Sequence, residues 1–178
     1  TLETLFSYPG FGIKTAALAG DIIFLGKSRA SGFNSSILRV NSRTGETVPV
    51  FDNTMLIYEA TYHQEDEKIY ALGVEQNGSG TRTVLKSFQY PAFNAASELL
   101  SYRGEDLTAH IAFNDNGNEV YTTLGFDGVT EISGRYSRNR FVQREHIPRR
   151  TFIHNNLLYT INTDYSITVW DRARQKRI

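Results

Sequence analysis

The sequence predicts an all-β protein, a β-propeller or partial propeller of about four four-stranded antiparallel blades. Three observations lead to this prediction. Apolar runs of four to six residues, bounded by Gly, Asn, Asp and Ser, follow one another with almost no helical spacing. Aromatic residues make up 12% of the 178 residues, which suits sheets. The same order of strands and turns also recurs four times along the chain.

One aromatic position marks each repeat. Phe24, Tyr70, Tyr121 and Tyr159 each follow aliphatic residues, and they are separated by 46, 51 and 38 residues. We expect these anchors at equivalent, mostly buried positions in the second strand of each unit. A polar turn and an earlier apolar residue precede each anchor, at Leu18, Tyr62, Phe113 and Ile153.

A third and a fourth strand are expected after the anchors. The expected third strands are Ile37–Val40, Val84–Phe88, Val129–Ile132 and Ile167–Trp170. The expected fourth strands are 47–51, 97–102 and 141–147. The best helix candidate, Pro91–Tyr102, reads equally well as a strand in its second half. Four antiparallel strands in roughly 40–50 residues are typical of a propeller blade.

Burial gives the repetition a physical reason. One small twisted sheet cannot cover both of its faces, whereas sheets packed around an axis cover one another. The chain is therefore expected to be a single domain with units at 11–53, 54–104, 105–148 and 149–178. The inner strands are expected to be buried on both faces, because the runs DIIFLG and NLLYTI are apolar throughout.

The two ends of the chain suggest how the array closes. Residues 3–8 resemble a fourth strand, and we expect them to pair with Ile167–Trp170 in the same chain or in another copy. An unpaired, β-branched edge would otherwise invite aggregation. Three arrangements remain open at this point: a closed four-bladed ring, a half ring completed by a second chain, or a fragment of a longer protein. The first residue is Thr1 rather than Met, which favours the fragment.

Two segments resemble known repeats. The stretches AFNDNGNEVYTTLGFDGVTEIS and IHNNLLYTINTDYSITVWDRARQKRI are similar to tryptophan–aspartate (WD) repeats, with turn residues Asp127 and Asp164 and the pair Trp170-Asp171. Bacterial YVTN or quinoprotein-like propeller repeats fit equally well. The sequence has one Trp-Asp and no Gly-His dipeptide, so the buried His–Asp network of WD repeats is not expected to be complete. Trp170 itself is expected to pack in the core.

Composition excludes several classes of function. The chain has no cysteine, which excludes disulfides, Cys-ligated zinc and thiol catalysis. No apolar run is long enough to span a bilayer. The 19 basic and 19 acidic side chains balance, which argues against nucleic acid as a partner. Localisation stays open, because exported bacterial and cytoplasmic domains both include proteins without cysteine.

Candidate chemistry is sparse. The turn His63–Glu67 offers imidazole and carboxylate groups, but acidic turns of this kind are ordinary surface, and Asn114–Glu119 is expected to be a hairpin turn rather than a calcium site. The general-base candidates are His63, His110, His146 and His154. No nucleophile elbow is present. No catalytic, cofactor-binding or metal-binding residue is therefore assigned.

The distribution of charge gives the main site prediction. Residues 1–134 carry a net charge of −7, and residues 135–178 carry +7. Arginines interleaved with aromatic residues can bind phosphate, acidic saccharides or an acidic protein surface. The candidate residues for partner or anion binding are Arg135, Tyr136, Arg138, Arg140, Arg144, Arg149 and Arg150.

The favoured function is therefore a non-catalytic recognition domain, a scaffold that binds a protein or peptide partner through propeller loops. Self-association that completes the propeller is a further expectation. One alternative is part of a propeller enzyme, a hydrolase, lyase or quinone-type protein with an axial site. Another is polyanion or carbohydrate binding through the Arg-rich segment.

Overall fold

The protein is all-β over the residues that can be described. The computed structural model describes residues 13–20, 22–28, 35–53, 55–90, 96–114, 117, 119–132 and 140–178. These residues contain no helix and form four antiparallel sheets of four strands each, which confirms the predicted fold class. No helix among them is long and apolar enough to cross a membrane.

The sheets follow one another in chain order, each with its four strands in sequence. The first sheet contains β1 (Ile13–Ala19), β2 (Ile22–Ser28), β3 (Ser35–Asn41) and β4 (Thr47–Asn53). The second contains β5 (Met55–His63), β6 (Lys68–Asn77), β7 (Gly80–Gln89) and β8 (Ala96–Arg103). The third contains β9 (Ile111–Phe113), β10 (Val120–Thr122), β11 (Gly128–Glu131) and β12 (Arg140–Val142). The fourth contains β13 (Pro148–His154), β14 (Leu157–Asn162), β15 (Ile167–Asp171) and β16 (Lys176–Arg177).

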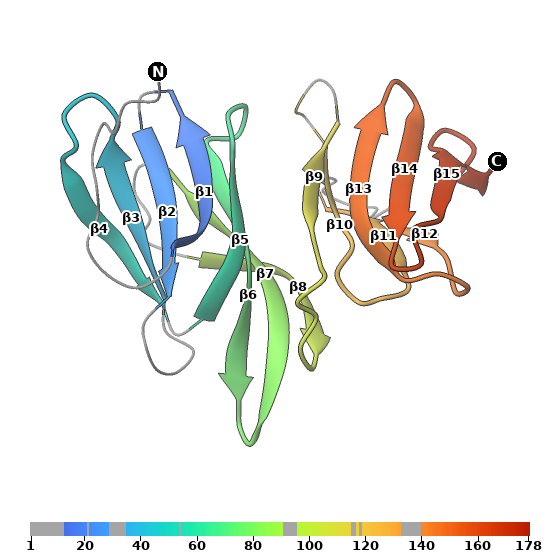
Figure 1. Ribbon diagram of the computed structural model, residues 1–178, viewed down its shortest axis with the longest axis horizontal. Helices are drawn as coiled ribbons and strands as arrows, with labels where there is room; N and C mark the ends of the chain where they lie inside the picture. The colour runs from blue at the N-terminus through green and yellow to red at the C-terminus, as the bar shows by residue number, and fades with distance from the viewer. Residues whose placement is uncertain are drawn as a thin grey trace.

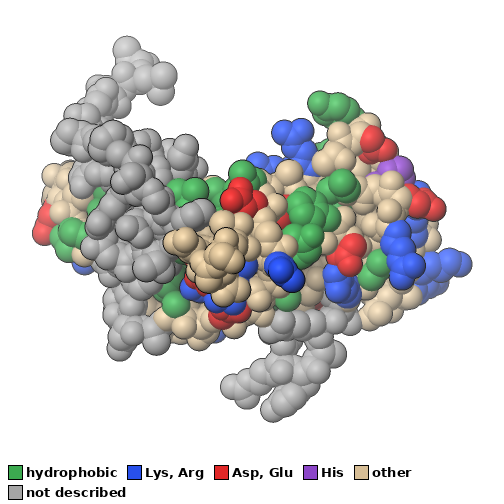
Figure 2. Space-filling model, turned by 90° about the horizontal axis from the view of Figure 1, so that it is seen from below, with side chains coloured by type: hydrophobic (Ala, Val, Ile, Leu, Met, Phe, Trp, Pro, Cys, Tyr) green, Lys and Arg blue, Asp and Glu red, His purple; other side chains and the backbone are tan. Residues whose placement is uncertain are grey.

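The four sheets form an arc. The first strands of successive sheets contact one another, β1 with β5, β5 with β9 and β9 with β13, so they make up the inner edge. The first and fourth sheets lie at opposite ends of the longest axis (Figure 1), and among the described residues the arc does not close into a ring. Lys and Arg side chains are concentrated toward the end that holds the fourth sheet (Figure 2).

The core consists of three layers between consecutive sheets. Apolar side chains from the first and second sheets form one cluster, those of the second and third another, and those of the third and fourth a last one. All four anchors lie in second strands, as predicted. Tyr70 and Tyr121 are buried and Tyr159 is half-buried, whereas the side chain of Phe24 lies outside the described part. Trp170 is buried in the last cluster, as expected.

The outer face of the fourth sheet corrects one expectation. Strand β14 alternates between buried and more exposed residues, and Ile161 is 36% exposed, so the run NLLYTI is not buried on both faces. Its buried face packs on the third sheet through Leu158. Within the described residues no further sheet covers the other face, and this is why the pattern is one-sided. Strand β6 lies between two sheets and is buried along most of its length.

The fourth strand of the last sheet was not expected. Strand β16 lies beside Trp170 and Asp171. Residues 3–8, which we expected to pair with Ile167–Trp170, lie outside the described part, so that pairing stays a prediction. The chain turns back after β15, because the backbone N–H of Arg174 donates to Asp171 Oδ1 at 3.1 Å. Two basic residues do not resemble a strand in sequence, which is why β16 was not expected.

Candidate functional site

β-Bulges interrupt three of the first strands along the inner edge of the arc, and those in β5 and β13 lie at the same site. The register between β5 and β6 shifts between Ile57 and Glu59, so that Tyr58 is the extra residue. The register between β13 and β14 shifts in the same way between Pro148 and Arg150 at Arg149. A bulge redirects a side chain that regular alternation would send to the other face. As a result, adjacent residues of one strand can line the same cavity.

A cavity of about 470 Å³ lies at these bulges. Its walls come from the first strands of the second and fourth sheets and from the segment that leads into β9. The lining residues are Tyr58, Glu59, Leu107, Thr108, Ala109, Arg149 and Arg150. A volume in this range is typical of ligand sites in proteins, roughly 300–1,000 Å³. We call this space the axial cavity, because it borders the inner edge of three consecutive sheets.

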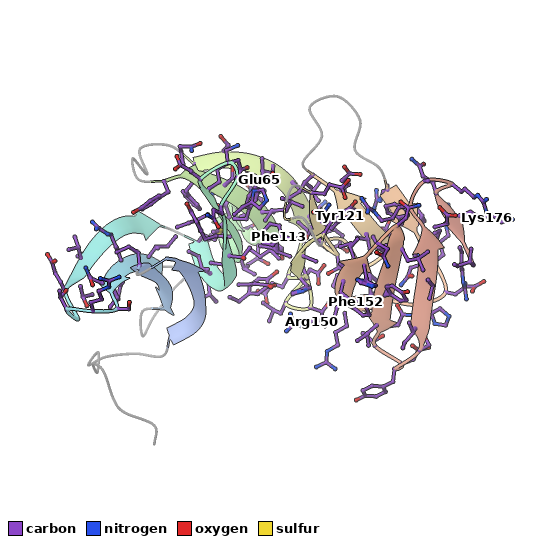
Figure 3. All side chains as sticks on the ribbon, turned by 90° about the horizontal axis from the view of Figure 1, so that it is seen from above. Glu65, Phe113, Tyr121, Arg150, Phe152 and Lys176 are labelled. Carbon is purple, nitrogen blue, oxygen red and sulfur yellow. The ribbon has the colours of Figure 1, made fainter. Side chains whose placement is uncertain are left out.

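Three charged or polar side chains meet beside the axial cavity. The Nδ1 atom of His110 lies 2.6 Å from Glu59 Oε1 and 2.6 Å from Arg150 Nη1, and Arg150 lies 3.9 Å from Glu59. An imidazole nitrogen either donates or accepts, and Arg can only donate. His110 Nδ1 therefore donates to Glu59 in one tautomer of the ring and accepts from Arg150 in the other. In Figure 3, Arg150 is labelled between the second sheet and the fourth sheet.

The wall around His110 is held by several hydrogen bonds. The backbone N–H of His110 donates to Thr123 Oγ1 at 2.9 Å, and the hydroxyl of Tyr58 donates to the carbonyl of Asp106 at 2.8 Å. Burial raises the pKa of Tyr58, and the nearby Asp106 and Glu59 charges raise it further, so the phenol stays protonated. Asp106 is itself buried, and its Oδ2 accepts from the backbone N–H of Gly125 at 2.9 Å.

Arg149 differs from its neighbours at the cavity. It is exposed, and within the described part of the chain it makes no hydrogen bond or ion pair. The Arg150 side chain is 59% exposed. The cavity thus carries two guanidinium groups against one carboxylate, that of Glu59, and one of the guanidinium groups has its donors available. This arrangement suits an anionic group, because a guanidinium can bind a carboxylate through two parallel hydrogen bonds.

The structure separates the arginines that the sequence grouped together. Arg149 and Arg150 reach the axial cavity. Arg140 lies on β12, at the far edge of the third sheet, where it pairs with Asp127. Arg144 is exposed in the loop that follows β12. The remaining predicted site residues, Arg135, Tyr136 and Arg138, lie outside the described residues.

Sequence reasoning missed Glu59 and Tyr58 altogether. Both lie in a strand whose alternation gives no sign of a bulge, and Glu59 is close to His110 only in the folded chain. His110 did stand out as a titratable residue, but its partners are 51 and 40 residues away. No signal in the sequence pattern marks either residue.

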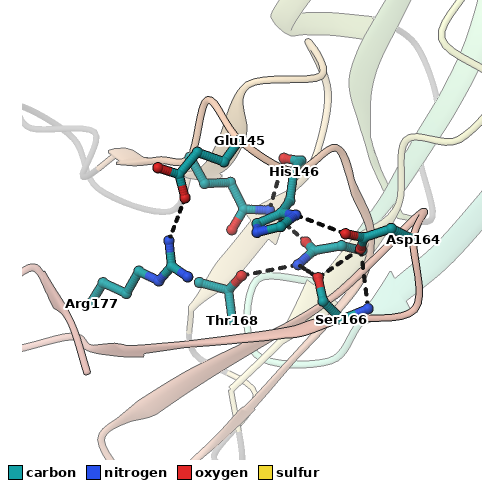
Figure 4. Close-up of polar contacts among 8 residues, drawn as sticks. Glu145, His146, Asp164, Ser166, Thr168 and Arg177 are labelled. Atoms are coloured by element: carbon teal, nitrogen blue, oxygen red, sulfur yellow. Dashed lines mark hydrogen bonds and ion pairs between the residues drawn. The ribbon is translucent and has the colours of Figure 1, made fainter.

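The other described histidines have different surroundings. The Nδ1 atom of His63 donates to Asp66 Oδ1, 2.7 Å away, and His154 is exposed. His146 Nδ1 lies 2.9 Å from Asp164 Oδ2 (Figure 4). No group of three or more His, Cys, Asp or Glu side chains among the described residues could hold a metal ion.

The contacts of Asp164 join two loops of the fourth sheet. Ser166 Oγ donates to Asp164 Oδ1 at 2.6 Å, so Ser166 and His146 both bind the carboxylate and not each other (Figure 4). The hydrogen bonds from Ser166 are the main cause that lowers the pKa of Asp164. A nucleophile must contact its base directly. The His146–Asp164 contact instead ties the loop before β13 to the β14–β15 turn. We did not expect such a His–Asp contact, because the sequence has no Gly-His dipeptide.

Comparisons with known proteins support the fold. No protein-family model and no curated protein sequence matches the chain. Among solved structures, the computationally designed Ika4 protein is similar with a TM-score of 0.60 and 17% identity, over 96% of this chain and 99% of that one. Hydrazine synthase from Kuenenia stuttgartiensis is similar with a TM-score of 0.66 and 12% identity, and TolB from Acinetobacter baumannii with a TM-score of 0.65 and 9% identity.

These similarities concern the fold alone. The chain matches at least 90% of its length in both natural proteins, but it spans only 58% of the hydrazine synthase chain and 43% of TolB. At sequence identities this low, the site residues of one protein cannot be assigned to positions in the other. The fold is therefore propeller-like.

Proposed function

We propose that this protein is a recognition domain that binds a carboxylate-bearing segment of a protein or peptide partner at the axial cavity. One observation carries the proposal. Arg149, which makes no hydrogen bond or ion pair among the described residues, lies next to Arg150 at one bulge of the cavity wall. The sheet fixes the backbone of both residues, and Arg150 is further oriented by His110 and Glu59, so binding has to order mainly the exposed side chain of Arg149.

The geometry favours a local acidic group over a long polyanion. Arg140 lies at the outer edge of the third sheet and is paired with Asp127, whereas Arg149 lies on the inner strand of the next sheet. A polyanion would need a continuous row of cations. Two adjacent guanidinium groups beside Glu59 suit one or two carboxylates.

A labelled acidic peptide tests this proposal. The probe is a fluorescent Gly-Glu-Glu-Glu-Gly peptide, with Gly-Gln-Gln-Gln-Gly as the neutral counterpart, and binding is followed by anisotropy. The double change Arg149→Ala and Arg150→Ala should weaken binding roughly 10- to 100-fold, because hydrogen bonds to charged groups contribute about 1.5–3 kcal/mol.

The matched control is Arg144→Ala, which removes an exposed arginine that does not line the cavity. It should leave the affinity within about twofold of wild type, because Arg144 lies outside the cavity and salt screens its charge from a peptide bound there. Equal binding of the Glu and Gln peptides, or an equal loss in the control, would overturn the proposal.

A second candidate function follows from one contact. Glu59 and His110 lie 2.6 Å apart at the cavity, a distance at which a carboxylate can orient an imidazole for proton transfer. The site would then be that of a hydrolase or lyase. Hydrolysis of p-nitrophenyl esters or glycosides that is lost in Glu59→Gln and kept in Arg144→Ala would support this candidate, and its absence would leave the binding proposal standing.

A further inference from the structure

The outer face of the fourth sheet carries a continuous group of apolar side chains. Phe152 lies opposite Tyr159, and Tyr159 lies opposite Val169. In the next row across the same strands, Ile161 lies opposite Ile167. Residues directly opposite each other in a sheet share a face, and Phe152 (Figure 3) is 46% and Ile167 61% exposed. Contiguous exposed apolar side chains of this kind mark a candidate interaction surface.

The second and third sheets show what the same face does elsewhere in this chain. Tyr70 and Tyr121 hold the position of Tyr159 in their own sheets, and each packs in a cluster with side chains of the next sheet. Tyr159 instead stacks on Phe152, with the ring centroids 4.8 Å apart. No further sheet of the described chain lies against these two rings. The outer face of the fourth sheet is therefore built like an interface.

One cation joins this face to the axial cavity. Arg150 lies opposite Ile161, so its side chain starts on the same face as the apolar rows. Its guanidinium group reaches the axial cavity, where Nη1 lies 2.6 Å from His110 Nδ1. A segment whose carboxylate binds Arg149 and Arg150 can therefore continue onto Ile161 and Ile167 without crossing another charged side chain of that row.

Charge decides which kind of partner suits the face. Residues 148–178 hold 6 basic and 2 acidic side chains, a net charge of +4. Both acidic residues have cationic or imidazole neighbours, because Asp164 contacts His146 and Asp171 lies 3.6 Å from Arg174. Two copies of this face would therefore repel each other, whereas an acidic polypeptide is attracted.

The first sheet does not offer a second copy a matching surface either. In β3, Ile37 packs toward the second sheet, so the neighbouring Leu38 and Val40 point to the other face. Both of these side chains are buried. A head-to-tail contact between two copies would need apolar side chains exposed on that face of the first sheet.

From these observations we propose that the partner is an acidic segment with apolar residues next to its carboxylates, and that these residues pack on the outer face of the fourth sheet. The inference rests on the proposed function, because the carboxylates bind Arg149 and Arg150 at the axial cavity. The adjoining apolar side chains lie against Phe152, Ile161 and Ile167. The cavity thus selects the charge of the segment, and the sheet face selects its apolar residues.

Two longer peptides test the apolar part with the intact chain. The first is fluorescent Leu-Gly-Leu-Gly-Glu-Glu-Glu-Gly-Leu-Gly-Leu, which has leucines on both sides so that either chain direction brings them to the face. The second has serine in place of every leucine. In anisotropy measurements the leucine peptide should bind about 10-fold more tightly, as expected when leucine side chains are partly buried on binding.

Four variants assign this preference to the face. Phe152→Ser and Ile167→Ser should each remove most of the preference for leucine and leave binding of the serine peptide unchanged, while thermal melting shows that the variants are folded. Val142→Ser is the matched control and should keep the preference, because Val142 is exposed on β12 and points away from the face on which Phe141 packs. Arg149→Ala should weaken both peptides alike.

Each contrary outcome has a separate meaning. Equal binding of the leucine and serine peptides to wild type would overturn this inference and leave the axial-cavity proposal in place. No binding of either peptide would remove both. A leucine preference that survives in Phe152→Ser and Ile167→Ser would place the apolar contacts elsewhere. A wild-type dimer in light scattering that Ile167→Ser dissociates would show that a second copy, and not an acidic segment, occupies the face.

Discussion

Arg172, in the turn after β15, donates a hydrogen bond from Nε to the hydroxyl of Tyr121 on β10, 3.0 Å away. The Tyr121 hydroxyl in turn donates to Glu119 Oε2 at 2.9 Å, and the Arg172 guanidinium also pairs with Glu119. The carbon of that guanidinium lies 5.5 Å from the centre of the Tyr121 ring. A buried aromatic anchor of the third sheet is thus joined to the fourth sheet through its polar end.

Replacing this anchor should separate its two contributions. Tyr121 is fully buried, so Tyr121→Ala should lower the free energy of unfolding by about 3–5 kcal/mol. Tyr121→Phe keeps the ring and should lower the free energy of unfolding by about 1 kcal/mol, because Arg172 still forms its ion pair with Glu119. Urea denaturation followed by fluorescence measures both. An equal loss in the two variants would mean that the hydroxyl, not the buried ring, provides most of the stability.

Trp170 should report on the interface between the third and fourth sheets. It is the one tryptophan in the sequence, it is 8% exposed, and its ring meets Phe141 edge to face with centroids 5.8 Å apart. We expect blue-shifted emission that iodide quenches poorly in the folded protein. Phe141→Leu should shift the emission to the red by loosening the contact. Red-shifted emission that iodide fully quenches in the wild type would contradict the buried position.

Glu75 should make stability depend on acid. Burial would raise its pKa, but hydrogen bonds from Lys86 Nζ at 2.6 Å and Arg82 Nε at 2.7 Å outweigh this and lower it below the ordinary value of 4.5. A carboxyl group with a lowered pKa stabilises the fold above its unfolded pKa, and this stabilisation is lost as the pH falls through the folded pKa.

The measurement is the unfolding free energy of wild type and Glu75→Gln between pH 3 and 8. We expect a difference of about 1–3 kcal/mol near pH 7 that shrinks in acid. Glu98→Gln is the control, because Glu98 contacts the same Arg82 but is 37% exposed at its side chain, and its effect should be smaller. A difference that stays constant down to pH 3 would exclude the ion pairs as its cause.

Gly128 should tolerate no side chain. Its φ is +152°, and a Cβ atom would overlap the backbone carbonyl oxygen of Phe141 on the paired strand. Gly128→Ala combines backbone strain with overpacking and should cost roughly 2–5 kcal/mol. Gly78→Ala is the control, because Gly78 also has a positive φ, +61°, but open space around it, and should cost about 1–2 kcal/mol. Similar melting temperatures for the two variants would contradict the clash.

The sequence was informative where local alternation and burial agree. Tyr70 and Tyr121 lie in second strands, as expected for short runs of aliphatic and aromatic residues bounded by turns. The axial cavity could not be predicted in this way. The bulges at Tyr58 and Arg149 leave no mark in the sequence pattern, and Glu59 meets His110 and Arg150 only through the packing of three sheets. The strand β16 was hidden for another reason, since the backbone of Lys176–Arg177 and not its side chains makes the pairing.

The inner edge has a consequence for how the protein unfolds. The main contacts between sheets join neighbours along the chain, so the array resembles a one-dimensional chain of units that can open from its ends. The axial cavity is an exception, because Arg150 of the fourth sheet lies 3.9 Å from Glu59 of the second. A ligand held there would link units that are not adjacent. Its binding would therefore merge separate opening steps into one cooperative transition, and amide hydrogen exchange in β13 and β14 would slow together with exchange in β5.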